Sequence, residues 1–261
     1  MYDEAKPLPS PALVDELNPF DDITLVPYDN QTLLGTPDRV VQLDVIMDNL
    51  GDGANYAFFN DITYVSPKVP SLYTALSAGN ATAANPAIYG SNTNAFVLAQ
   101  GEVVQIIVNN LDSGRHPFHL HGHQFQALYR SVDEAGTYED DTGAPHSEDA
   151  FPAIPMRRDT FVLYPDGNMV LRFRAENPGI WLFHCHIEWH VSSGLIATFI
   201  EAPLDIPAAL RNATGDDTIP RDHIAACAVD GTPTKGNAAG NAVNFLDLTG
   251  ENVSPARLPD G

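Results

Sequence analysis

The 261-residue sequence predicts an all-β fold in the form of an antiparallel β-sandwich. Several short segments alternate apolar and polar residues with the period of two that is typical of strands. Gly, Pro, Asn and Asp residues separate these segments and predict turns. Helical periodicity is weak, so strands are expected to form most of the core, for which a hydrophobic content of 44% is sufficient.

The first two predicted strands lie at residues 39–49 and 102–110. In the first, Val41, Leu43 and Val45 are separated by polar residues, which predicts one buried face. The second, "EVVQIIVNN", has a similar rhythm. Between them, "VPSLYTALSAG" at 69–79 is the best candidate for a short helix.

Two further strands are predicted at residues 168–177 and 195–202. In the first of these, Met169 and Leu171 lie on one face, and Arg172 lies on the other with the remaining charged residues. The second, "LIATFIEA", closes the series of strands.

These strands predict one domain at residues 39–203. Residues 1–38, rich in Pro, Asp and Asn, are expected to be an extended segment or linker from a preceding domain. Residues 204–261 are expected to be a C-terminal tail, either wrapped on a partner surface or disordered. Residues 131–149 predict an acidic surface loop.

The charge balance restricts the possible partners. The chain has 13 Lys+Arg against 34 Asp+Glu, a formal net charge of −21, which argues against binding nucleic acid or an anionic membrane surface. The negative charge is compatible with attracting cations, although solubility is the simpler explanation. No run reaches the ~18 consecutive apolar residues of a membrane span.

Four Asn-x-Ser/Thr sequences, at Asn30, Asn80, Asn212 and Asn252, predict an extracellular or cell-surface glycoprotein. No signal peptide follows Met1, which suggests that residue 1 is not the natural start of the protein. Whether a membrane anchor belongs to the full-length protein stays open.

The histidines gather in two short motifs, "HPFHLHGH" at 116–123 and "HCHIEWH" at 184–190. Successive side chains of a strand point to opposite faces, so His184 and His186 share one face and Cys185 takes the other. By the same rule, His116 has the opposite parity to His119, His121 and His123.

Cys185 has His116 and His190 as its natural partners. A thiolate with two imidazoles is the ligand set of a blue-copper site, whose weak axial ligand is often Met. Leu195 stands where that Met would be expected, which predicts three-coordinate copper with a raised potential. Zinc is the alternative, but structural zinc sites usually have four ligands, and no fourth ligand is found.

The opposite face collects four imidazoles, and these predict half of a polynuclear copper site: His119, His121, His184 and His186. His123 is expected to orient a metal ligand without binding the metal itself. His146 and His223 are expected to be ordinary histidines. With Cys185 engaged by metal, Cys227 would be unpaired or paired with a cysteine outside this chain.

The two motifs resemble the C-terminal copper motifs of multicopper oxidases, and most closely those of fungal iron-uptake ferroxidases and ascomycete laccases. The resemblance extends from "LVPYDNQTLL" through "PMRRDT" to "LDLTGEN". It implies a cupredoxin-like Greek-key β-sandwich, with an irregular N-terminal extension and a C-terminal tail.

The resemblance also implies copper as cofactor and a role for each site residue. His116, Cys185 and His190 would bind the type 1 copper, with Leu195 at the axial position. The type 2 copper would take His119, and the type 3 pair would take His121, His184 and His186. Glu188 would deliver protons, or serve only as a structural acid. Asp112 would help to bind ferrous iron, or serve only to form a turn.

The implied activity couples one-electron oxidation of ferrous iron or a phenol to four-electron reduction of dioxygen to water. Asp112 and the acidic surface favour iron. The trinuclear site of the family needs eight histidines, and this chain offers four, so N-terminal cupredoxin domains absent from the chain would supply the rest. The alternatives are a stand-alone cupredoxin that carries electrons and a zinc-binding structural module.

Overall fold

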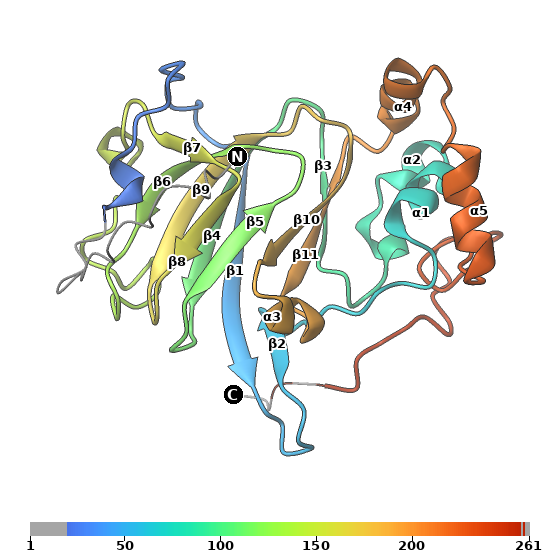
Figure 1. The fold of residues 1–261 in the computed structure, drawn as a ribbon, viewed down its shortest axis with the longest axis horizontal. Coiled ribbons are helices and arrows are strands. Elements are labelled where there is room, and N and C mark those ends of the chain that lie inside the picture. Colours follow the sequence, from blue (N-terminus) through green and yellow to red (C-terminus); the bar gives the residue numbers. More distant parts are fainter. Residues whose placement is uncertain (1–19, 257, 259–261) are drawn as a thin grey trace, which may run out of the picture.

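The computed structural model describes residues 20–256 and residue 258, and two β-sheets dominate this part of the chain (Figure 1). The strand order is β2-β1-β4-β9-β6-β7 in the six-stranded sheet and β3-β11-β10-β5-β8 in the five-stranded sheet. The six-stranded sheet contains β1 (Arg39–Asp48), β2 (Tyr56–Phe59), β4 (Val103–Asn110), β6 (Phe125–Arg130), β7 (Met156–Arg158) and β9 (Asn168–Arg174). The five-stranded sheet contains β3 (Ala95–Leu98), β5 (His116–Leu120), β8 (Thr160–Leu163), β10 (Gly179–Cys185) and β11 (Ile196–Glu201). The predicted all-β fold is confirmed.

The hydrophobic core draws on strands of both sheets. As predicted, Val41, Leu43 and Val45 of β1 are buried on one face. Phe118 of β5 is fully buried, and its ring centroid lies 5.5 Å from that of Phe59. Burial of this kind is the main stabilising term for such a fold.

The expectation of wholly antiparallel pairing is wrong for two pairs of strands. β1 pairs in parallel with β4, and β3 pairs in parallel with β11. Parallel neighbours need a long connection, and the chain between β1 and β4 passes through β2, two α-helices, a 3-10 turn and β3. Alternation in a sequence indicates that a strand exists but carries no information on its direction.

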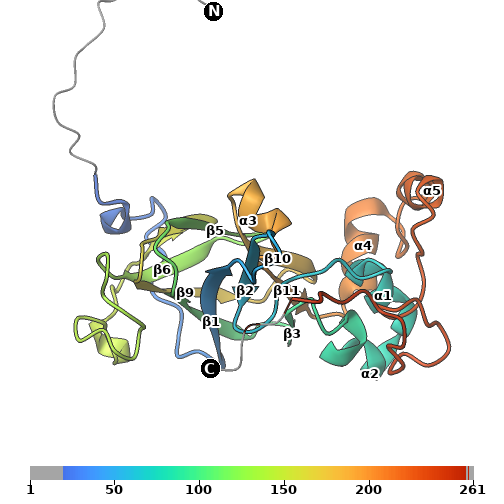
Figure 2. The ribbon, with the colours of Figure 1, turned by 90° about the horizontal axis from the view of Figure 1, so that it is seen from below.

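Except for α3 (Glu188–Ser192), which follows β10, the helices gather at one end of the molecule, beside β3 and β11 (Figures 1 and 2). The helix predicted within residues 69–79 is α1 (Ser71–Ala78). Four more helices were not predicted: α2 (Asn80–Ala83), α3 (Glu188–Ser192), α4 (Ile206–Thr214) and α5 (Arg221–Val229). Short 3-10 turns occupy Asp22–Thr24, Pro86–Tyr89 and Glu148–Ala150. Within the described residues, no helix combines the length and the apolar character that crossing a bilayer requires.

The C-terminal segment after α5 packs back on its own domain. Ala238 donates its N–H to Ile88 O at 2.9 Å, and its carbonyl accepts from Lys68 N at 2.9 Å. The carboxylate of Glu251 accepts from the backbone and hydroxyl of Ser91. Figure 1 shows this segment running beside α1 and α2 before it returns toward β2.

The segment before β1 is tied to β6 and β7 by ion pairs. Arg130 lies 2.8 Å from both Asp21 and Asp22, and Arg158 lies 2.6 Å from Asp22. Leu34 donates its N–H to Gln126 Oε1 at 2.9 Å. The described part of residues 1–38 is therefore extended along the domain.

The acidic loop at 131–149 is anchored more firmly than a solvated loop would be. Asp141 is only 7% exposed and accepts hydrogen bonds from Tyr129 Oη at 2.7 Å and Asn168 Nδ2 at 3.0 Å. Tyr138 N–H donates to Asn109 Oδ1 of β4. The exposed acidic residues of the loop therefore belong to a segment whose backbone is held against the domain by these hydrogen bonds.

Candidate metal centre

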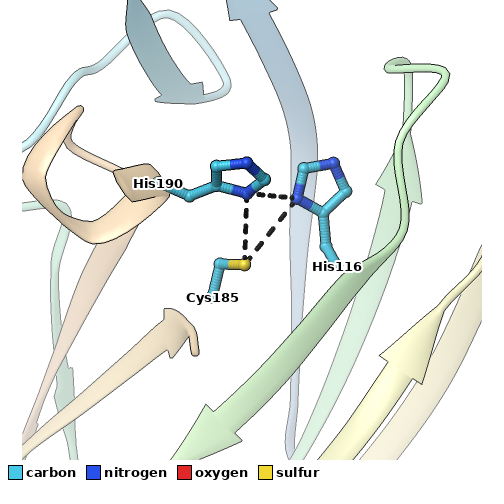
Figure 3. A group of neighbouring side chains, drawn as sticks. All are labelled: His116, Cys185 and His190. Atoms are coloured by element: carbon cyan, nitrogen blue, oxygen red, sulfur yellow. Dashed lines mark hydrogen bonds between the residues drawn. The ribbon is translucent and has the colours of Figure 1, made fainter. Parts of the chain in front are cut away.

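Three potential metal donors meet where β5, β10 and α3 come together (Figure 3). Sγ of Cys185 lies 3.4 Å from Nδ1 of His190 and 3.8 Å from Nδ1 of His116. The two Nδ1 atoms are 3.1 Å apart. Cys185 and His116 are fully buried, whereas His190 is half-buried. The three atoms all lie within 4.8 Å of one another, so a single ion could contact all three.

The local fold explains how residues distant in sequence meet. β5 and β10 are antiparallel neighbours, with Cys185 opposite Phe118, so the start of β5 lies beside the end of β10. The short helix α3 then reverses the chain and brings His190 back over Cys185. Ser193 O accepts from Ala57 N at 2.9 Å and from Thr63 Oγ1 at 2.9 Å, which fixes the exit from α3.

Burial sets the protonation of these donors. It lowers the pKa of His116 despite the hydrogen bond to Asp112, and it lowers the pKa of His190. Burial also raises the pKa of the Cys185 thiol to about 11. At neutral pH the imidazoles are therefore neutral and ready to ligate, and a bound metal would displace the thiol proton.

The donor set fits copper. One thiolate and two imidazole Nδ1 atoms in a small, largely buried space are the ligands of a blue-copper site. Within the described residues, no other His, Cys, Asp or Glu joins this close-set group, which leaves the four-ligand requirement of structural zinc unmet.

Asp112 supports His116 from outside the group. Its Oδ2 lies 3.0 Å from Nε2 of His116 and also accepts from Gly114 N at 2.8 Å. The side chain is 24% exposed, so the carboxylate borders both the buried histidine and solvent. The sequence placed Asp112 near this histidine, and the structure brings the two into contact.

Leu195 lies at the end of the turn after α3. Its carbonyl accepts from Cys185 N at 3.3 Å, and its side chain is fully buried in the core that contains Cys185. The axial position of Leu195 stays a prediction. The side chain of Leu195 has no polar atom that could bind a metal.

A second group of imidazoles lies on the other side of β10. His184 pairs across the sheet with His119, and its Nε2 lies 2.9 Å from Nε2 of His121. Ring centroids within the group, which also includes His186, are 4.9–5.7 Å apart. Burial lowers the pKa of both His121 and His184, with further lowering from neighbouring histidines. The structure thus separates the histidines into the two groups that strand parity predicts.

His123 does not belong to this second group. β5 ends at Leu120, and the chain turns at His121 and Gly122, so His123 leaves the predicted extended run. Its Nε2 lies 2.8 Å from Oε2 of the buried Glu201. Burial alone would lower the pKa of His123, but the bond to Glu201 and the charge of that residue raise it.

The remaining candidate residues lie near the surface. Glu188 is exposed at the start of α3, two residues beyond His186, which is also exposed. His146 contacts Asp141 O in the acidic loop, away from both groups. Cys227 is a free thiol 3.6 Å from the hydroxyl of Tyr73.

A cavity of about 300 Å³ opens beside the half-buried His190. Trp189, which is 81% exposed, Tyr56 and Met47 contribute to its lining, and Asp48 adds a carboxylate. This cavity was not anticipated, because its walls come from β1, β2 and α3. Glu201 was also missed. Its only signal is a carboxylate at the end of the apolar run "IATFIE".

Comparison with known proteins gives consistent matches. The family model described as "Multicopper oxidase" matches residues 64–205. "Iron transport multicopper oxidase fetC" of Epichloe festucae is 62% identical over 260 residues, which are 100% of this chain and 40% of that protein. "Iron transport multicopper oxidase FET3" of Saccharomyces cerevisiae is 47% identical over 100% of this chain and 41% of that protein. The chain spans about 40% of the length of these relatives.

Solved structures agree with these matches. "Crystal Structure of Fet3p, a Multicopper Oxidase that Functions in Iron Import" describes a chain that is 47% identical, with a TM-score of 0.81. The match covers 97% of this chain and 47% of that chain. The laccase from Botrytis aclada, at 24% identity and a TM-score of 0.58 over 77% of this chain and 33% of its own, shares the fold.

Proposed function

The chain belongs to the multicopper oxidase family, and we propose that it takes electrons from ferrous iron and works with preceding cupredoxin domains that reduce dioxygen to water. Family membership implies copper as the cofactor. The observation that carries the proposal is the three-donor group of His116, Cys185 and His190, with Asp112 bound to His116 at the boundary with solvent.

The three-donor group would hold the type 1 copper. Copper bound there would supply one-electron redox chemistry. Leu195, which we assign to the axial position, would keep water away from the metal with its fully buried side chain. The backbone at 184–186 joins this group covalently to the second histidine group, since His184 and His186 flank Cys185.

The second group would contribute half of the ligands of the trinuclear site. His119 would bind the type 2 copper, and His121, His184 and His186 the type 3 pair. The exposure of His186, whose ring centroid lies 5.7 Å from those of His119 and His184, supports a site that is completed by donors outside this chain. Glu188, exposed beside His186, would release protons from its carboxyl to dioxygen as it is reduced.

Ferrous iron is favoured as substrate by the chemistry around His116. Carboxylate oxygen is a suitable ligand for a hard divalent cation, and the carboxylate of Asp112 is accessible to solvent. The net charge of −21 favours cations over anions near this surface. The names of the fetC and FET3 relatives assign those proteins to iron transport.

Oxidation of phenols is the second candidate activity. The 300 Å³ cavity beside His190 favours it, because Trp189, Tyr56 and Met47 provide aromatic and apolar contacts for a ring. Its Asp48 and two asparagines make the lining partly polar. A stand-alone electron carrier has less support, since the second histidine group would have no use in it.

We place the protein outside the cell or at the cell surface, as a glycoprotein. Asn30, Asn212 and Asn252 are exposed in Asn-x-Ser/Thr sequences. The side chain of the fourth, Asn80, lies outside what the structure describes. A shift in electrophoretic mobility after glycosidase treatment, reduced by Asn30→Gln, tests this placement. An unchanged mobility of the natural protein would refute it.

Absorption of the Cu(II)-loaded chain tests the proposed blue site. We expect an intense copper–thiolate band at roughly 600 nm that is absent in Cys185→Ser and retained in His146→Ala, a histidine variant outside both groups. A band of equal strength in Cys185→Ser would contradict the assignment. Steady-state rates of the enzyme assembled with its preceding domains, with ferrous iron and with a phenol, then decide between the two substrates.

A further inference from the structure

The turn that follows β5 is held by side chains from distant parts of the chain. The carbonyl of His121 accepts from Nδ1 of His123 at 3.1 Å. The next carbonyl, of Gly122, accepts from Nδ2 of Asn177 at 2.9 Å. Both carbonyls of the turn are therefore hydrogen-bonded to side chains.

The two residues that supply these donors, His123 and Asn177, both contact through other atoms a single carboxylate, that of Glu201 in β11. Oε2 of Glu201 lies 2.8 Å from Nε2 of His123, and Oε1 accepts the backbone N–H of Asn177. Glu201 is fully buried, and the side chain of His123 is 6% exposed.

The side chain of Trp181 also packs against the turn. A Cβ at Gly122 would lie 2.6 Å from the Trp181 ring, so the backbone of the turn rests directly on the indole. The indole N–H donates to Asn177 O at 2.7 Å, which ties it to the same assembly. Gly122 has φ +70°, a conformation that glycine adopts readily.

Burying the carboxylate of Glu201 costs free energy, and the contacts around it only offset that cost. We therefore expect this assembly to matter more for the geometry of the turn than for the free energy of unfolding. The turn it fixes carries His121, whose Nε2 lies 2.9 Å from Nε2 of His184.

We propose that Glu201 is a positioning residue that fixes the His121–Gly122 turn through His123 and Asn177, so that the His121 ring faces His184. The proposal rests on the proposed role of His121 as a copper ligand. Glu201 itself touches neither copper nor substrate. Its loss would misplace one ligand of the trinuclear site and leave the His116–Cys185–His190 group in place.

The metal-free chain provides the first test, because the contact between His121 and His184 does not depend on metal. We expect the imidazole nitrogen resonances of His121 to shift in Glu201→Gln and in His123→Gln. The control is Glu148→Gln, which removes a carboxylate 2.8 Å from the buried Arg172 and does not touch the turn. Unchanged His121 resonances in both variants would overturn the proposal.

Copper binding provides the second test. A Cu(II) titration followed by electron paramagnetic resonance should show about 10- to 100-fold weaker binding to the second histidine group in Glu201→Gln. The band of the blue site should be unchanged. Equal weakening at both sites, or the same loss in Glu148→Gln, would show that Glu201 only stabilises the fold.

The failure of this proposal can be distinguished from the failure of the proposed function. If the wild-type chain shows no blue band, the proposed function fails, but the His121 resonances of the metal-free variants still test the role of Glu201.

If Glu201→Gln does not fold, Asn177→Ala replaces it, because Asn177 is exposed and its side chain makes only one hydrogen bond to the turn. We expect about twofold to tenfold weaker binding from the loss of this one hydrogen bond. Unaltered binding and unaltered His121 resonances in Asn177→Ala would overturn the proposal in that case.

Discussion

The carboxylate of Asp112 lies 3.0 Å from Nε2 of His116, while Nδ1 of the same ring faces Sγ of Cys185 at 3.8 Å. An imidazole that donates its Nε2–H to a carboxylate presents its lone pair at Nδ1. Asp112 therefore orients a proposed copper ligand and reaches solvent with the same side chain. The two roles can be separated by experiment.

Asp112→Asn removes the charge and keeps the size of the side chain. We expect the blue band to persist, because an amide oxygen can still accept from His116. The kcat/KM for ferrous iron should fall about 10- to 100-fold, since the carboxylate is lost as an oxygen ligand. The kcat/KM for a phenol should change little. Equal losses for both substrates would show that Asp112 only orients His116.

Leu195→Met tests the axial assignment. A thioether placed against copper should lower the reduction potential of the blue site, measured by redox titration, and keep the blue band. The exchange of Leu for Met in a core costs less than about 1.5 kcal/mol, so the fold should tolerate it. Ile196→Met is the matched control, because Ile196 is also buried but does not belong to the core cluster that contains Leu195 and Cys185. An unchanged potential in Leu195→Met would place its side chain elsewhere.

The grouping of the histidines could be predicted because it is local. Alternation along "HCH" depends only on strand geometry, and the structure places Cys185 and its two flanking histidines on opposite sides of β10. The direction of β4 relative to β1 could not be predicted, since it depends on the long connection between them. The helix α5 was missed because its residues show little apolar periodicity, whereas α4 is amphipathic and could have been predicted.

The prediction that His123 continues the strand was wrong for a different reason. Extending the strand to residue 123 required Gly122 to continue it, whereas Gly122 turns at φ +70° against Trp181. The partner of His123, Glu201, lies far away in sequence, and no local pattern connects them. Side-chain assemblies of this kind become visible only when the strands are placed next to one another.

Gly194→Ala should destabilise the exit from α3. Gly194 has φ +106°, and a Cβ there would lie 2.1 Å from Oγ1 of Thr63 and 2.9 Å from Tyr64 N. We expect a loss of about 2–4 kcal/mol in the free energy of unfolding, from backbone strain and overpacking together. The blue band should weaken as well, because Gly194 lies between His190 and Leu195. Chemical denaturation and absorption measure the two effects.

Gly101→Ala is the control for backbone strain alone. Gly101 has φ +82°, but nothing lies within 4 Å of a Cβ at this position. Its loss of stability should be about 1–2 kcal/mol, with no effect on the blue band. Equal effects of the two substitutions would refute the proposed collision with Thr63.

Asp141 gives the domain a pH-dependent source of stability. Burial would raise the pKa of Asp141, but hydrogen bonds from Tyr129, Asn168 and the Gly143 backbone outweigh it and hold the pKa below its ordinary value. A carboxyl whose pKa is lower in the folded state stabilises the protein above its unfolded pKa of about 3.9. This stabilisation is lost as pH falls through the folded pKa.

Asp141→Asn should therefore lower the free energy of unfolding of the metal-free chain by about 1–3 kcal/mol at neutral pH, because buried donors lose a charged acceptor. The difference from the wild type should begin to shrink below about pH 4, where the carboxyl of the unfolded chain takes up a proton, and should be smallest below the lower pKa of the folded protein. Glu139→Gln removes an exposed charge from the same loop and should change little at any pH. Urea denaturation at several pH values measures all three proteins. A difference that stays constant down to the most acidic pH would mean that the charge of Asp141 adds nothing to its hydrogen bonds.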